Sequence, residues 1–76
     1  MNKLSENITK MAVDYLGPAA LRFLERQTMS HMNGLDFRNI EKGHLTELSR
    51  WINISGSMVI DKDKAKELSD KIRSLG

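Results

Sequence analysis

The chain has 76 residues, no cysteine, and twelve basic against ten acidic side chains, so its net charge is +2. The missing cysteine excludes disulfides and thiolate zinc sites, although domains of this length usually need a staple, a metal, well-idealised helix packing or a partner subunit. We therefore expect one domain, residues 1–76, that buries only about 60% of the surface its unfolded chain exposes and has a thin stability margin.

The first predicted helix spans residues 4–16. Ser5 or Asn7 is its expected N-cap, because both side chains can accept a hydrogen bond from a free backbone N–H. Gly17 ends it, since glycine readily adopts the left-handed conformation found just after helices. Spacings of four, three and four place one apolar stripe on this helix, formed by Leu4, Ile8, Met11 and Tyr15.

A corner between two helices is predicted within the run YLGPAALRFLERQ, where Gly17 precedes the only proline, Pro18. Proline suits the first turn of a helix, because its φ is already fixed and its missing N–H has no partner there. The second helix is expected over residues 18–32, with Asn33-Gly34 ending it. Its predicted inner face consists of Ala20, Leu21, Leu24, Thr28 and Met32.

Residues 34–41 show no helical or strand period, and we expect Leu35, Phe37 and Ile40 to enter the core from a loop or single turn. The third helix is predicted over residues 42–54 and ends at Ser55-Gly56. Its expected inner stripe is Leu45, Leu48 and Ile52, with Trp51 on one flank.

Residues 57–60, SMVI, favour a strand but are too few to form one alone, so we expect a loop that buries Met58 and Ile60. Asp61 caps a fourth helix over residues 61–75. Its predicted inner face is Ala65, Leu68, Ile72 and Leu75, with Glu67 and Lys71 paired outside. The sequence thus predicts an all-α fold, a compact bundle of four short helices.

No arrangement of catalytic or metal-binding residues is evident, so we expect neither enzymatic activity nor a cofactor or metal. His31, beside the inner face of the second helix, is interpreted as a hydrogen-bonded core residue, and His44 as exposed. Asp61 and Asp63 superficially resemble a calcium loop, but lysine and alanine stand where that loop needs oxygen ligands and glycine.

A helix-turn-helix that binds nucleic acid is the alternative function. The third helix would then present Lys42, His44, Glu47, Arg50 and Asn53 to a groove. Phosphate would repel Glu47, and no second basic element follows. We therefore predict that nucleic acid is not the partner, and that the basic side chains share no single surface: Lys42, Arg50, Lys62, Lys64 and Lys66.

Several apolar side chains lie off the predicted inner stripes, namely Val13, Phe23 and Ile54, while Trp51 lies on a flank. Short helices in a compact bundle can bury more than one stripe, which is the simpler interpretation. The other is a surface for self-association or for a helical protein partner, with Phe23, Trp51 and Ile54 as its residues, because aromatic side chains dominate interface energetics. Both interpretations stay open at the level of sequence.

Residues 1–10 lack the apolar run of a secretory signal, and no segment approaches the roughly 20 apolar residues of a membrane span. We therefore expect a soluble, cytoplasmic protein without membrane association.

The run YLGPAALRFLER resembles a group of small, all-helical bacterial modules of unknown function, which stand alone or follow signalling domains such as kinases and cyclases. Those modules share a Leu/Ile-Gly-Pro corner and a following hydrophobic helix that bears arginine, matched here by Gly17, Pro18, Arg22 and Arg26. The segment LTELSRWI, residues 45–52, is similar to their later helix. The resemblance implies a regulatory or protein-interaction role and no catalytic residue.

Overall fold

Every regular element of the computed structural model, which describes residues 1–76, is helical, and residues 57–60 form no strand. The predicted all-α class is therefore confirmed. The α-helices are α1 (Lys3–Leu16), α2 (Ala20–His31), α3 (Leu45–Gly56) and α4 (Lys62–Arg73), and short 3₁₀ turns cover Gly17–Ala19, Phe37–Asn39 and Lys42–His44.

The helix boundaries differ from the predicted ones mainly where 3₁₀ turns begin a helix. Residues 18–19 and 42–44 were expected to be α-helical, but both lie in 3₁₀ turns, which are frequent at helix ends. At its C-terminal end, α3 is longer than predicted. It continues through Gly56, which keeps a negative φ and so does not stop the helix. The last helix, α4, ends two residues earlier than predicted, at Arg73.

The corner predicted at Gly17-Pro18 is confirmed. The first helix ends at Leu16, and Gly17 has φ 64° and ψ −148°, a combination that is essentially restricted to glycine. Its backbone N–H donates to the Val13 carbonyl, which closes the last turn of α1. Pro18 lies in the 3₁₀ turn that leads into α2, so this pair fixes the direction of the chain between the two helices.

The N-cap of α1 is Asn2, and the expectation of Ser5 or Asn7 was wrong. The Asn2 side-chain oxygen accepts from the Ser5 backbone N–H at 2.8 Å, while its Nδ2 donates to the Ile40 carbonyl, also at 2.8 Å. Its backbone N–H donates to the Arg38 carbonyl at 3.2 Å. One residue therefore caps the helix and joins it to a segment 38 residues away, which no local pattern indicates.

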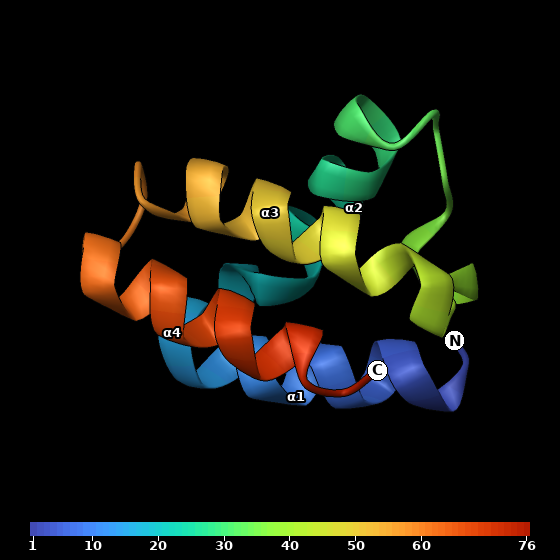
Figure 1. Ribbon diagram of the computed structural model, residues 1–76, viewed down its shortest axis with the longest axis horizontal. Coiled ribbons are helices and arrows are strands. Elements are labelled where there is room, and N and C mark those ends of the chain that lie inside the picture. The colour runs from blue at the N-terminus through green and yellow to red at the C-terminus, as the bar shows by residue number, and fades with distance from the viewer.

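The helices α3 and α4 lie side by side and run antiparallel, and α1 packs along α4 (Figure 1). Small residues allow α3 and α4 to lie close together. A Cβ added to Gly56 of α3 would be only 3.3 Å from the Cβ of Ala65 on α4. Further along, the buried Ser69 hydroxyl donates to the Ser49 carbonyl at 2.8 Å. The two chain ends lie near one another in Figure 1.

The core forms where these helices meet the 35–40 segment. Phe37 and Ile40 are each 1% exposed and Leu35 is partly buried, which confirms that this irregular segment contributes to the core. The predicted inner residues of the helices are buried, apart from a few partly exposed ones at the edges. The buried cluster consists of Ile8, Ala12, Ala20, Leu24, Met32, Phe37, Ile40, Leu45, Leu48, Ile52, Leu68 and Ile72.

Candidate interaction surface

The three residues predicted to bind a partner occupy two kinds of position. Phe23 on α2 and Trp51 on α3 are partly buried and pack against the core cluster with one side. Ile54, on α3, is 45% exposed. The two aromatic side chains therefore belong to the core and to the surface at once, while Ile54 is mainly a surface residue.

Phe23 and Trp51 both border the seam between α2 and α3. Four-residue spacing puts Phe23, Gln27 and His31 on one face of α2. The Phe23 ring lies about 4.0 Å from where a Cβ on Gly56 would stand, at the end of α3. The His31 ring stacks on the Trp51 ring, with centroids 4.0 Å apart and planes 10° from parallel. Phe23 thus lies near the last residue of α3, and His31 lies against the middle of that helix.

His31 is exposed, so the interpretation of it as a hydrogen-bonded core residue was wrong. Its place at the last turn of α2 lets the imidazole cover one face of Trp51. On α3, the Arg50 guanidinium carbon lies 5.6 Å from the Trp51 ring centroid. Trp51 is therefore held in position by side chains from both helices.

The turn after α3 is the largest correction to the sequence analysis. Met58, expected in the core, is 83% exposed, and Val59 is 64% exposed, while Ile60 is partly buried. The backbone N–H groups of Val59 and Ile60 both donate to the Gly56 carbonyl, at 2.9 and 2.8 Å. This tight turn follows directly from the continuation of α3 through Gly56, and it directs residues 58 and 59 away from the core.

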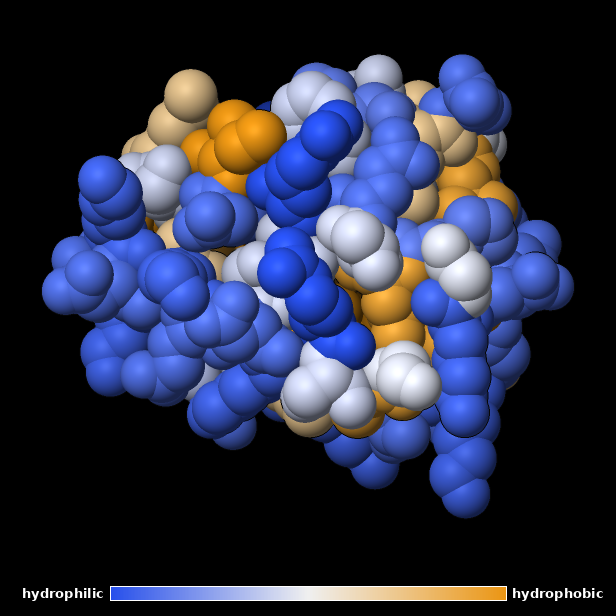
Figure 2. All heavy atoms as spheres, in the orientation of Figure 1, coloured by the Kyte–Doolittle hydropathy of each residue, from blue (hydrophilic) through white to orange (hydrophobic).

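The apolar side chains that are exposed or partly exposed on α2, α3 and the turn after α3 are here called the α2–α3 patch: Phe23, Trp51, Ile54, Met58 and Val59. Phe23 and Val59 line a hollow of about 190 Å³ together with Ala19, Arg22 and Arg26. Figure 2 shows apolar atoms gathered over the C-terminal part of α3, at the upper left, next to strongly hydrophilic side chains. The patch is thus an apolar surface that includes a hollow and has a charged border.

Three arginines border the patch without an ion-pair partner. Arg22 and Arg26 line the hollow beside Phe23, and Arg50 lies over Trp51. The ion pairs of the molecule lie elsewhere and join Arg38 to Asp36, Lys66 to Asp70 and Lys71 to Glu67. Arg22, Arg26 and Arg50 are therefore exposed and make no ion pair within the chain.

Two buried polar atoms have no hydrogen-bond partner, and both belong to residues of the α2–α3 seam. They are the side-chain oxygen of Gln27 and the indole nitrogen of Trp51. The Gln27 amide nitrogen makes only a long bond, 3.3 Å, to the Phe23 carbonyl. Because an unsatisfied buried group costs about 1–3 kcal/mol, a hydrogen-bond partner for either atom would stabilise the seam.

Val13, the remaining apolar residue off the inner stripes, lies on α1 and is 46% exposed. It lines a separate hollow with Met1, Thr9 and Lys10 and does not join the α2–α3 patch.

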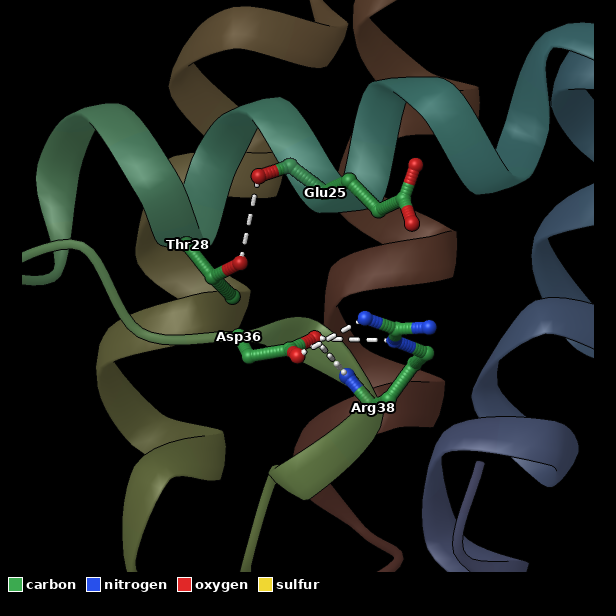
Figure 3. Close-up of polar contacts among 4 residues, drawn as sticks. All are labelled: Glu25, Thr28, Asp36 and Arg38. Carbon is green, nitrogen blue, oxygen red and sulfur yellow. Dashed lines mark hydrogen bonds and ion pairs between the residues drawn. The ribbon is translucent and has the colours of Figure 1, made fainter.

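A third hollow, of about 440 Å³, lies between α2 and residues 35–38. Figure 3 shows Arg38 turned back onto Asp36, beneath Glu25 of α2. The Arg38 Nε and a terminal guanidinium nitrogen donate to the two Asp36 oxygens at 3.2 and 3.1 Å. These bonds lower the pKa of Asp36 and raise that of Arg38. The charges of Asp36 and Arg38 therefore satisfy each other, while Arg22, Glu25 and Arg26 line the same hollow without an ion pair.

No metal site is formed by the side chains of the chain: His, Asp and Glu gather nowhere in a group of three or more. His31 stacks on Trp51, whereas His44 is partly buried and its Nδ1 accepts from the Glu41 backbone N–H at 3.0 Å. The two histidines thus have separate structural contacts. No helix has the length and apolar character needed to cross a membrane.

The predicted pair of Glu67 and Lys71 is present at 3.8 Å, and α1 adds a third group that the sequence did not indicate. The Tyr15 hydroxyl donates a hydrogen bond to Glu67, and the Lys71 ammonium lies 5.1 Å from the Tyr15 ring centroid. This hydrogen bond is the main cause that lowers the pKa of Glu67, and the nearby charge of Lys64 lowers it further.

We expect the Tyr15–Glu67 contact to make stability depend on pH in the acidic range. Because the pKa of Glu67 is lower in the folded state, the contact stabilises fully above the usual value of 4.5 and is lost as pH falls through the folded value. Urea unfolding of the parent and of Glu67→Gln should show a stability difference at pH 7 that shrinks toward about pH 3. Tyr15→Phe should behave in the same way. A difference independent of pH would contradict this assignment.

Comparison with protein-family models, curated proteins and solved structures finds no significant match for this chain.

Proposed function

We propose that this chain is a small, non-catalytic protein-interaction or regulatory module, which associates with itself or with a helical partner through the α2–α3 patch. The observation that carries the proposal is the exposure of Met58 and Val59 beside the half-buried Phe23 and Trp51. Contiguous exposed apolar surface with a polar border is typical of interaction sites. Association would cover these side chains.

The arrangement of the patch suits binding, because its aromatic side chains are already ordered. Trp51 is stacked between helices and Phe23 packs against the core, so little side-chain freedom is left to lose when a partner binds. Well-packed aromatic residues at the centre of an apolar surface are typical of binding hot spots. The resemblance of the Gly17-Pro18 corner to small helical modules, which stays a prediction, implies the same kind of role.

The positions of the basic side chains give less support to a nucleic-acid partner than to a protein partner. Lys42 lies at the start of α3, near the C-terminal end of α4, whereas Lys62 and Lys64 lie in the first turn of α4. Antiparallel packing of α3 and α4 puts these groups at opposite ends of the helix pair. Lys66 is paired with Asp70 at 2.9 Å. We therefore expect no tight, salt-sensitive binding to duplex DNA or RNA.

The proposal predicts that acidic substitutions in the patch abolish association. We would compare the parent with Trp51→Glu, Phe23→Glu, Ile54→Glu and Met58→Glu by sedimentation at several concentrations and by capture of partners from the native host. Ile54 and Met58 are the safer sites, because they are exposed and their loss leaves the core intact. Circular dichroism would confirm that each variant is folded.

Val13→Glu is the matched control, since Val13 is as exposed as Ile54 but lies on another face. It should leave association unchanged. The proposal is wrong if the parent is monomeric at every concentration and the folded patch variants capture the same partners as the control.

A further inference from the structure

We propose that the occupant of the α2–α3 patch is an amphipathic helix of another protein, with Asp or Glu bordering its apolar face, and not a second copy of this chain. This inference rests on the proposed function and specifies its partner. Its basis is the set of unpaired arginines around the apolar side chains.

The arginines are placed to meet acidic groups on either side of a docked helix. Arg22 and Arg26, one helical turn apart on α2, line the hollow that Phe23 and Val59 also line. Arg50 stands over Trp51 on α3. Arginine pairs with carboxylates through two parallel hydrogen bonds, which gives geometric specificity as well as attraction. An apolar side chain in the hollow would therefore bring neighbouring carboxylates to the arginines.

The length of the seam fits a helix. Phe23 and His31, which both lie against α3, are eight residues apart on α2, or about 12 Å at 1.5 Å per residue. A partner helix that presents apolar side chains at i, i+4 and i+7 covers a similar length, and this is a common mode of recognition. The partner would thus extend the helical packing of α2 and α3 by one more helix.

A second copy fits the patch less well. In a two-fold symmetric contact the same surface meets itself, so Arg22, Arg26 and Arg50 would be brought near the same arginines of the partner subunit. Glu47, one turn before Trp51, and Glu25, between Arg22 and Arg26 on α2, could offset part of this repulsion, but they are two charges against three. An anionic membrane is also a poorer match, because Trp51 is fixed by its stack on His31 and its indole N–H is buried.

The test uses two synthetic peptides with one identical leucine face, flanked by glutamate in one and by lysine in the other. Trp51 is the only tryptophan, so its fluorescence reports binding at the patch directly. We expect the glutamate peptide to bind at least about tenfold more tightly than the lysine peptide, because like charges disfavour the wrong partner. The preference should weaken between low and high salt.

The double variant Arg22→Gln and Arg26→Gln should bind the glutamate peptide less than about threefold more tightly than the lysine peptide. Without the two positive charges, the glutamates lose their ion-pair partners. Arg38→Gln, which removes an arginine already paired with Asp36, is the matched control and should leave the preference unchanged. Both variants change exposed side chains, so the fold should persist.

Three results would overturn the inference. Equal binding of the two peptides, or binding of neither, would refute an acidic helical partner. Binding of phosphatidylserine-containing vesicles through the patch would identify a membrane surface instead. Self-association abolished by Ile54→Glu, with no competition from the glutamate peptide, would refute this inference while leaving the proposed function intact. If none of the patch variants changes any association, both this inference and the proposed function are wrong.

Discussion

Replacing Phe37 by alanine is expected to lower the free energy of unfolding by about 3–5 kcal/mol. Phe37 is 1% exposed and heads the fully buried side chains by volume. It enters the core from a 3₁₀ turn between α2 and α3, and its truncation would leave a cavity among the buried residues of the core cluster. A domain of this length has a total stability of about 4–11 kcal/mol, at 0.05–0.15 kcal/mol per residue. The substitution therefore removes a large fraction of it.

Urea unfolding followed by circular dichroism measures this effect. Asn39→Ala, in the same turn but exposed, is the matched control and should change stability by less than about 0.5 kcal/mol. Phe37→Leu should fall between the two, because leucine fills part of the volume. If Phe37→Ala and Asn39→Ala are equally stable, residues 35–40 do not contribute to the core as the structure indicates.

The second large effect is expected at Gly56, where α3 and α4 approach one another closely. A Cβ there would already lie 3.3 Å from the Ala65 Cβ, and about 4.0 Å from both Ile52 and Phe23. Gly56→Leu adds three further carbon atoms at this contact and should destabilise the protein by about 3 kcal/mol through overpacking. The structural displacement that relieves this overpacking should also move Phe23 and so disturb the α2–α3 patch.

Gly56→Ala separates packing from backbone effects. Alanine has the higher helix propensity, by about 1 kcal/mol in a helix interior and less at the last residue of α3, which partly offsets the tight contact with Ala65, so the net change should be small. Adding Ala65→Gly to Gly56→Leu should recover part of the lost stability, because the two sites are in contact and their effects are not additive. If the Gly56→Leu variant is as stable as the parent, α3 and α4 do not pack this closely.

The seam of α3 and α4 illustrates why some buried positions were missed by sequence reasoning. Apolar periodicity marks large hydrophobic residues, whereas Ser5, Gln27, Thr28, Ser49 and Ser69 are also buried. Of these only Thr28 was predicted, because it shares the spacing of its apolar neighbours on α2. Serine is buried where two backbones approach and a carbonyl accepts its hydroxyl, as Ser49 does for Ser69. That condition depends on a neighbour twenty residues away.

The candidate surface was only half predictable for a similar reason. Phe23, Trp51 and Ile54 could be selected because they lie off the inner stripes, and helix geometry settles this from local spacing alone. Met58 and Val59 could not, since their exposure follows from where α3 ends. A glycine near a helix end favours a stop, but Gly56 has a negative φ and packs close to Ala65, and α3 ends two residues after its predicted end at residue 54.

The sequence by itself determined the features that depend on neighbours within one or two helical turns. These are the helical class, the inner stripes, the Gly17-Pro18 corner and the Asp61 cap, whose carboxylate accepts from the Asp63 N–H at 3.4 Å. Only the tertiary structure decided the cap supplied by Asn2 and the stacking of His31 on Trp51. Those contacts join residues distant in the chain, and their free energy depends on how whole helices are packed together.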